Sequence, residues 1–201
     1  MSRDISSSWA ISNHLPEALE SARKASDLDA ELLKQNPSSP ALQMNLAMDL
    51  MAIGSAYSDM GKYAPAIDYQ RQSITLREQV AAANPAGRRA ADRLGYAVYM
   101  LAVAEQRQGD KAATRRDFRR AVDIYDGLKK KTPLSSQSLL NFARSSYWVG
   151  RYETETGNRS EGCRSFWLAL SLAEEYNLKE PAQPETNTVE EDRVAVRSCS
   201  R

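Results

Sequence analysis

Few side chains in this chain of 201 residues have types and spacings that could do chemistry. His14 is the only histidine, and Cys163 and Cys199 are the only cysteines. A single imidazole excludes sites built on two histidines, and two isolated cysteines exclude a thiolate zinc site and a disulfide scaffold. The chain also lacks a Gly-x-Ser-x-Gly elbow, a Walker loop and a dinucleotide-binding glycine pattern. We therefore expect a protein that is not an enzyme and that has no catalytic residues, no metal site and no cofactor.

The isolated nucleophiles have structural interpretations instead. We interpret His14, near an expected helix junction, as a hydrogen-bonded structural histidine, and Cys163 as a packing residue on a helix. Cys199, close to the C-terminus, is expected to be a free thiol. The scarcity of cysteine and the absence of an apolar signal segment at residues 1–8 favour a reducing, cytoplasmic location.

Two basic segments, Arg115–Arg120 and Lys129–Lys131, are dense enough to suggest an anionic partner. On a helix, the arginines of the first segment form two adjoining exposed stripes and Phe118 points inward. The segments either bind a phosphate-rich partner or form the solvated back of a helix, flanked by acidic residues (Asp110, Asp123, Asp126). Nucleic acid is disfavoured as a partner because no exposed aromatic residues are interleaved with the arginines.

The overall composition points to an ordinary globular protein. Hydrophobic residues make up 42% of the chain and charged residues 26%, with 27 basic against 26 acidic residues. This near-neutral balance gives no general attraction to nucleic acid or to an anionic membrane. The unbroken apolar runs are only a few residues long, so we expect no membrane-spanning segment.

Prolines and glycines recur along the chain at a constant interval of 48 residues. The two series are Pro37, Pro85, Pro133 and Pro181, and Gly61, Gly109 and Gly157, with Asn13 in the equivalent earlier position. Such self-similarity is typical of a repeat architecture.

One repeat has the pattern of two helices. Apolar residues between Pro37 and Gly61 step by three or four positions, which predicts a helix that ends at a left-handed glycine. A second stripe runs from Tyr63 to Val80, and the Asn84-Pro85 step ends it. Each helix spans about 18–22 residues, and small residues let the paired helices approach closely (Gly54, Ala102, Gly150). One pair cannot bury both of its stripes, so successive pairs are expected to stack into an array.

These residues carry a family resemblance. Leu50-x2-Ile53-Gly54-x2-Tyr57, followed by Gly61-Lys62-Tyr63-x2-Ala66 and Pro85, resembles the tetratricopeptide repeat signature. The interval of 48 residues exceeds the family's usual 34, and it is similar to long-period arrays such as those at the C-terminus of bacterial serine/threonine kinases. The resemblance implies an all-α fold: a right-handed superhelical solenoid of antiparallel helix pairs. The unit at residues 85–132 departs from the signature at three positions (Ala102, Glu105, Thr114).

The repeat interval predicts five segments. These are a truncated first repeat (1–36), three full repeats (37–84, 85–132 and 133–180), and a linker with a short capping helix (181–201). Ile5 and Trp9 are in phase with Ile53 and Tyr57, so the first helix is expected to begin before residue 1 in a longer protein. The alternative is that Met1 is the true start and the first unit is a shortened cap.

At the C-terminal end, Thr188-Val-Glu-Glu191 has the form of a capping box. It predicts a helix over about 188–198 with Val189, Val194 and Val196 on its apolar side. A frayed tail is the alternative.

In arrays of this kind the first helices of successive pairs line a concave face. We predict a partner-binding groove there, formed by side chains one helical turn apart: Met48, Met51, Ser55, Tyr96, Tyr99, Val103, Arg144, Tyr147 and Arg151. Tyr, Met and Arg are enriched at protein interfaces, and arginines can bind carboxylates or phosphate. The alternative is that these side chains pack between neighbouring helices or against the chain's own terminal segment.

The sequence thus predicts a non-enzymatic scaffold that binds a peptide, a helix or a protein surface in its concave groove. The alternative function is a regulatory or oligomerising C-terminal segment of a larger signalling protein, such as a bacterial serine/threonine kinase. Exposed terminal helices could also form a homodimer.

Overall fold

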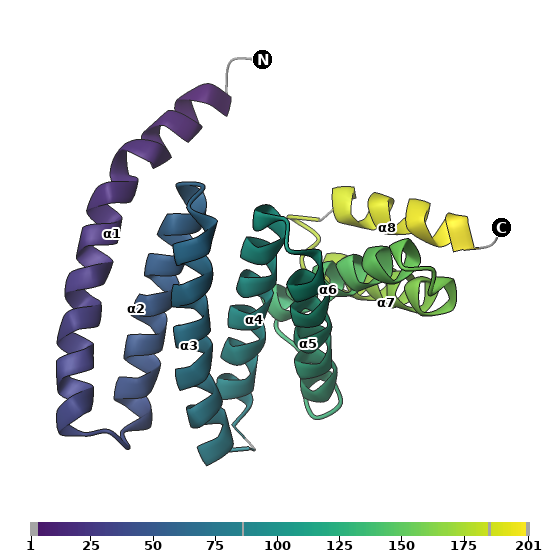
Figure 1. The fold of residues 1–201 in the computed structure, drawn as a ribbon. Coiled ribbons are helices and arrows are strands. Elements are labelled where there is room, and N and C mark those ends of the chain that lie inside the picture. Colours follow the sequence, from purple (N-terminus) through teal and green to yellow (C-terminus); the bar gives the residue numbers. More distant parts are fainter. Residues whose placement is uncertain (1–3, 86, 185, 200–201) are drawn as a thin grey trace. The chain divides into compact units, whose positions relative to one another are not determined.

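A computed structural model describes the backbone of residues 4–85, 87–184 and 186–199, and the side chains of residues 15–85, 87–184 and 189–199. Eight helices and no strand occupy this part of the chain (Figure 1), which confirms the all-α prediction. The helices are α1 (Asp4–Gln35), α2 (Pro40–Asp59), α3 (Tyr63–Ala83), α4 (Arg88–Gln108), α5 (Lys111–Lys129), α6 (Ser136–Glu155), α7 (Arg159–Lys179) and α8 (Thr186–Cys199).

The helix boundaries follow local chemistry. The side-chain oxygens of Ser39 and Ser135 accept hydrogen bonds from the backbone amides at the starts of α2 and α6, and Pro40 occupies the first turn of α2. Gly61, Gly109 and Gly157 follow the ends of α2, α4 and α6 with φ of 72°, 92° and 86°. The expected left-handed glycines are therefore present.

Glycine also permits the close approach of paired helices. A Cβ atom on Gly54 would lie 3.1 Å from the carbonyl oxygen of Ala66 on α3. A Cβ atom on Gly150 would lie 2.6 Å from Cδ1 of Phe166 on α7, which is closer than real side chains approach. The close approach of the paired helices therefore explains why small residues are needed at these two positions.

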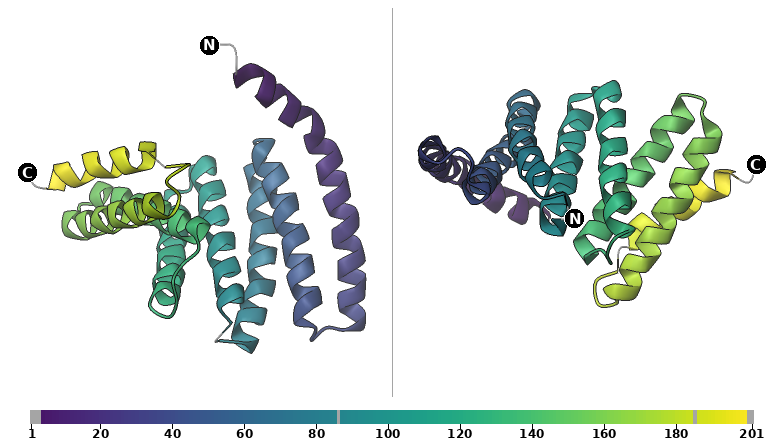
Figure 2. Two further views of the ribbon diagram at one scale, coloured as in Figure 1. Left: turned by 180° about the vertical axis from the view of Figure 1, so that it is seen from behind. Right: turned by 90° about the horizontal axis from the view of Figure 1, so that it is seen from below.

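The chain divides into two compact units. Unit 1 comprises residues 1–90 and 103–110, and unit 2 comprises residues 91–102 and 111–201. In unit 1, α2 packs against α1 and α3 around buried Ile53, Ile67 and Ile74. In unit 2, α6 packs against α5 and α7, and α8 packs against α7 (Figure 2), with the largest buried side chains contributed by aromatic and leucine residues (Phe118, Tyr125, Leu139, Phe142, Leu172).

The N-terminal helix departs from the repeat pattern. The turn expected at Asn13 is absent, because α1 runs without a break from Asp4 to Gln35 and contains Pro16. No residue other than glycine has a positive φ in the described backbone, and Asn13 lacks glycine's freedom to make the left-handed turn. The side chains of Ile5, Trp9 and His14, on which earlier expectations rested, lie outside the described residues.

The cysteines overturn two expectations. Cys163 on α7 and Cys199 on α8 form a disulfide with an S–S distance of 2.08 Å, so Cys199 is not a free thiol and Cys163 is not merely a packing residue. Sequence spacing concealed this pair because antiparallel packing brings the end of α8 to the start of α7. Disulfides persist in oxidising surroundings, so the cysteines no longer support the expectation of a reducing cytoplasm.

The C-terminal helix is present, and it is longer than predicted. It covers Thr186–Cys199, and Val189 and Val196 are buried as expected, whereas Val194 is 57% exposed. Val194 is therefore wrongly placed on the apolar side, because it lies two positions from Val196 and helical neighbours at that spacing do not share a face. The expected capping box includes Thr188, whose side chain lies outside the described residues.

Within the described chain, none of the helices has the length and apolar character that crossing a bilayer requires.

Candidate partner-binding site in unit 2

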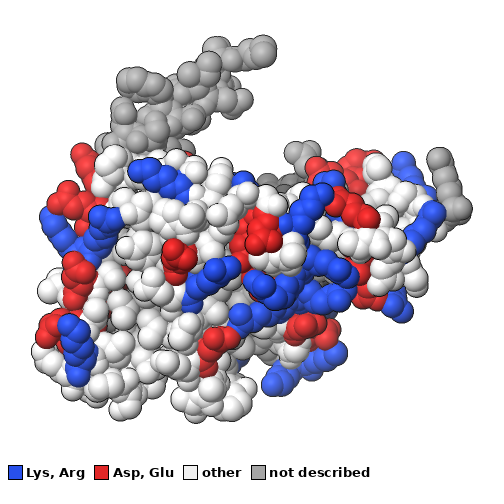
Figure 3. All heavy atoms as spheres, in the orientation of Figure 1, with Lys and Arg blue, Asp and Glu red and all other residues white. Residues whose placement is uncertain are grey.

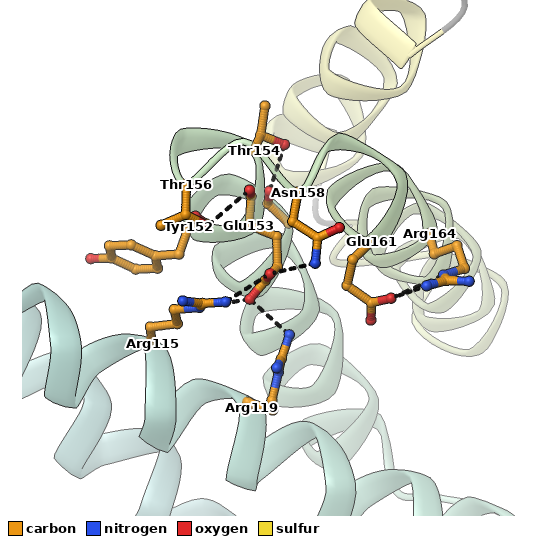
Figure 4. Close-up of polar contacts among 10 residues, drawn as sticks. Arg115, Arg119, Tyr152, Glu153, Thr154, Thr156, Asn158, Glu161 and Arg164 are labelled. Atoms are coloured by element: carbon orange, nitrogen blue, oxygen red, sulfur yellow. Dashed lines mark hydrogen bonds and ion pairs between the residues drawn. The ribbon is translucent and has the colours of Figure 1, made fainter.

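A fully buried carboxylate organises the centre of unit 2. Glu153 on α6 has no exposed surface, and it accepts hydrogen bonds from Arg115 at 2.7 and 2.9 Å and from Arg119 at 2.7 Å. Asn158, in the turn before α7, donates a further bond at 3.1 Å. Figure 4 shows the two arginines reaching Glu153 from α5. Burial alone would raise the pKa of Glu153, but the Arg115 hydrogen bond and the two arginine charges hold it below its ordinary value.

This network engages part of the basic segment Arg115–Arg120. Arg115 and Arg119 are engaged by Glu153, and Arg116 pairs with buried Asp117 at 2.8 Å. A hollow of about 540 Å³ beside them is lined by two acidic side chains, Asp123 and Glu161, as well as by Arg119 and Arg164. Basic side chains do gather over α5 (Figure 3), but internal carboxylates offset much of their charge. A second hollow, of about 570 Å³, is lined by Arg115, Arg116, Arg119 and Arg120 together with Asp123, so the segment combines internal ion pairs with exposed basic charge.

Sequence reasoning missed Glu153, although a signal was available. Glu105, at the equivalent position one repeat earlier, is also buried and lies 3.0 Å from Arg71 on α3. Arg71 and Arg119 are likewise equivalent positions. A charged residue that recurs at a position otherwise held by an aromatic residue indicates a buried ion pair.

Aromatic rings form a continuous row on the same unit. Tyr99 on α4 contacts Phe118 on α5 at a centroid distance of 6.1 Å, and Phe118 stacks on Trp148 of α6, also at 6.1 Å. Tyr147 meets Trp148 edge to face at 5.7 Å. Each such pair stabilises the fold by about 0.5–1.5 kcal/mol beyond area burial. Phe118 is fully buried, as predicted, whereas Tyr99, Tyr147 and Trp148 are half-buried.

A cation lies on the exposed side of this row. The guanidinium of Arg151 lies over the Trp148 ring, 5.0 Å from its centroid, and the side chain is 45% exposed. Arg151 also approaches Glu155, one turn along α6, at 3.7 Å. A stacked guanidinium keeps its hydrogen-bond donors available at the edge of the plane, which is how arginine recognises carboxylates. We call Tyr99, Arg144, Tyr147, Trp148 and Arg151 the cation–aromatic surface.

Helix α8 adjoins this surface at Tyr147. Burial raises the pKa of Tyr147; the charge of Arg151 opposes that rise, while those of Glu191 and Asp192 add to it. Asp192 is itself fully buried, and neither of its carboxylate oxygens has a hydrogen-bond partner among the residues whose side chains are described. Burial and the charge of Glu191 raise its pKa to about 7. The C-terminal helix therefore places acidic residues next to the aromatic row.

The nine predicted groove residues are all at least partly exposed. Five of them belong to unit 2: Tyr96, Tyr99, Arg144, Tyr147 and Arg151. The other four belong to unit 1: Met48, Met51, Ser55 and Val103. The sulfur of Met51 lies 3.7 Å from the guanidinium of buried Arg77. Trp148, which holds Arg151 in place, was not predicted, although its spacing from Arg151 signals a shared helical face.

Comparisons with known proteins agree with this architecture. A family model described as tetratricopeptide repeat matches residues 43–84. The crystal structure of BtubC (BKLC) from P. vanneervenii is similar, with a TM-score of 0.56 and 11% identity over 92% of this chain and 73% of that chain. The crystal structure of MamA aligns with a TM-score of 0.48 and 14% identity over 100% of this chain and 95% of that one. The search of curated proteins found no match.

The fold is of the class of helical solenoids, which are built from antiparallel helix pairs. The family match then shows one tetratricopeptide repeat at residues 43–84, within α2 and α3. A repeat fold of this type is consistent with a protein-interaction scaffold.

Proposed function

We propose that unit 2 binds an acidic peptide segment of a protein partner on its cation–aromatic surface. The observation that carries this proposal is the half-exposed Arg151 guanidinium stacked on Trp148. Buried aromatic rings below it fix its position, so little side-chain freedom would be lost when a carboxylate binds.

The surface suits a peptide that combines carboxylates with apolar side chains. Half-buried tyrosine and tryptophan rings provide rigid apolar contacts, and Arg144 and Arg151 lie two helical turns apart on α6. A basic partner would instead meet like charge from both arginines.

An unbiased peptide library displayed against the whole protein tests the proposal. Enriched peptides should be rich in Asp and Glu and contain at least one large apolar residue. Arg151→Gln should weaken their binding about tenfold, a loss of about 1.4 kcal/mol. Arg164→Gln is the matched control, because Arg164 pairs with Glu161 on its own helix and lies away from the surface. Basic enriched peptides, or equal binding by the two variants, would refute the proposal.

The alternative of a kinase-associated segment stays a prediction, and the coding sequence upstream of residue 1 tests it. A Gly-rich loop followed by a His-Arg-Asp catalytic loop would support it. A homodimer also stays a prediction. Leu28 and Leu32 on α1 and Trp167 and Leu178 on α7 are exposed apolar side chains, and sedimentation of the purified chain measures whether they associate.

A further inference from the structure

Helix α8 packs against α7 through its disulfide, a small apolar contact and exposed polar pairs. Two valines, Val189 and Val196, are its buried apolar residues among those whose side chains are described. Arg159 donates to the carbonyl oxygen of Ser198 at 2.6 Å, and Arg193 pairs with Glu174 at 3.3 Å, with both side chains about half exposed. Exposed pairs of this kind contribute little to stability.

Asp192 opposes the docking of α8. Its carboxylate is removed from water without a hydrogen bond, which costs free energy unless the group takes up a proton. The ionisable groups near Asp192 are Glu191 on its own helix and Tyr147 on α6, which also lies near Arg151. The Glu174–Arg193 pair joins α7 to α8. A 14-residue helix is also marginal when it is not packed against a neighbour. The disulfide is therefore the contact that keeps α8 in place.

We propose that the Cys163–Cys199 disulfide is a redox latch, and that its reduction releases α8 from α7 while the α6–α7 pair stays folded. Both cysteines are half-buried, so a thiolate can reach them. A dithiol reductant attacks one sulfur through a mixed disulfide. It supplies two electrons and two protons and leaves as its own cyclic disulfide, and the protein is left with two thiols. The proton on Asp192 is lost to solvent when the carboxylate becomes exposed near neutral pH.

The α6–α7 pair has its own support without α8. Gly150 and Gly162 allow close contact between the two helices, and Phe166, Ala169 and Ala173 are buried in α7. Glu153 on α6 is bound by Arg115 and Arg119 of α5 and by Asn158, none of which belongs to α8. Release of α8 also frees Tyr147 from the charges of Glu191 and Asp192, and the effect of that change on partner binding rests on the proposed function.

Hydrogen exchange of the full chain tests the latch independently of any partner. After dithiothreitol reduction at pH 7.5, amides of residues 189–199 should exchange at least about 100-fold faster, while those of α6 and α7 change little. Cys163→Ser and Cys199→Ser should each show the fast exchange with or without reductant. Asp192→Asn should restore part of the protection in the reduced protein. Unchanged protection of α8 after reduction, or simultaneous loss of protection in α6 and α7, would overturn the proposal.

Loss of Arg151-dependent binding of library peptides would refute only the proposed function, because the exchange experiment involves no peptide.

Discussion

Units 1 and 2 each bury a glutamate at the same position of the repeat, but the two glutamates have different partners. Glu105 in unit 1 meets Arg71 at 3.0 Å, whereas Glu153 in unit 2 is bound by Arg115, Arg119 and Asn158. Both carboxylates are almost completely buried, and both are approached by an arginine from the second helix of the preceding pair. The repeat thus places a buried carboxylate and an arginine of the preceding helix pair at equivalent positions in both units.

Unit 2 also carries features beyond the repeat. It holds the stacked Arg151–Trp148 pair, a row of aromatic rings, the disulfide and the capping helix α8. Unit 1 has a cation over a ring as well, with Arg23 lying 5.7 Å from the Tyr57 centroid and donating a hydrogen bond to its hydroxyl. The two units share the repeat framework, and the side chains that differ at equivalent positions give each unit its own surface.

The largest expected effect concerns the disulfide. Cys163→Ser should weaken the docking of α8 on α7 by about 3–4 kcal/mol, because the cross-link joins residues 36 positions apart, and should change the unfolding of the α6–α7 pair little. Stability of unit 1 should not change. Residue-resolved urea unfolding measures both units in one sample. If the variant and wild type still differ in reducing buffer, loss of the cross-link is not the cause.

The next effect separates the two carboxylates. Glu153→Gln should cost about 2–3 kcal/mol, and Glu105→Gln about 1 kcal/mol, because more charged donors lose their partner in unit 2 and the arginines remain partly solvated. Thermal unfolding of both variants measures the difference. Equal costs would show that the added donors in unit 2 contribute nothing.

Acid titration sharpens this comparison. The pKa of Glu153 lies below its ordinary value of 4.5, so its contribution to stability is fully present above that value and is lost as the pH falls through the lowered pKa. Wild type should therefore lose more stability than Glu153→Gln between about pH 5 and pH 3. Parallel stability curves for the two proteins would contradict the ion-pair assignment.

The paired glycines give a smaller effect. Gly150→Ala should destabilise unit 2 by about 1–3 kcal/mol, because the new methyl group overlaps the Phe166 ring. Gly54→Ala should change unit 1 by no more than about 0.5 kcal/mol, because alanine's helix propensity offsets a milder contact with Ala66 and Gln70. Chemical unfolding of both variants provides the comparison, and a larger loss at Gly54 would reverse it.

The smallest effect depends on pH. Asp192→Asn should stabilise the docking of α8 by about 1 kcal/mol at pH 8, because the buried asparagine amide is neutral but still unpartnered. The pKa of Asp192 is raised to about 7, so its favourable contribution is complete below its ordinary value of 3.8 and is lost as the pH rises through 7. The gain from the variant should therefore vanish below about pH 4. Hydrogen exchange in α8 measures it, and a gain independent of pH would exclude titration of Asp192.

The sequence predicted the parts of the fold that depend on local chemistry. Proline and glycine positions located the helix boundaries from Pro40 to Lys179, because turn conformation depends on a few neighbouring residues. The continuous helix through Asn13 was not predicted. The repeat interval placed a turn at this position, and we expected it although Asn13 is not a glycine.

Contacts between distant residues were harder to predict. The Cys163–Cys199 disulfide and the Glu153 network join residues far apart in the sequence, and periodicity reports which face a residue occupies without naming its partner. Arg151 was predicted as an exposed cation, but its ring partner Trp148 was not, because inward and outward aromatic residues alternate closely on α6.

Nuclear magnetic resonance of the arginine side chains tests the central claim, that unit 2 carries the partner-binding surface, most directly. Titration with an acidic peptide enriched from the library should shift the Nε–Hε signal of Arg151 and the indole signal of Trp148, and leave the signals of Arg23 and Arg71 in unit 1 unchanged. Shifts confined to Arg23 or Arg71, with Arg151 and Trp148 unaffected by saturating peptide, would contradict the account.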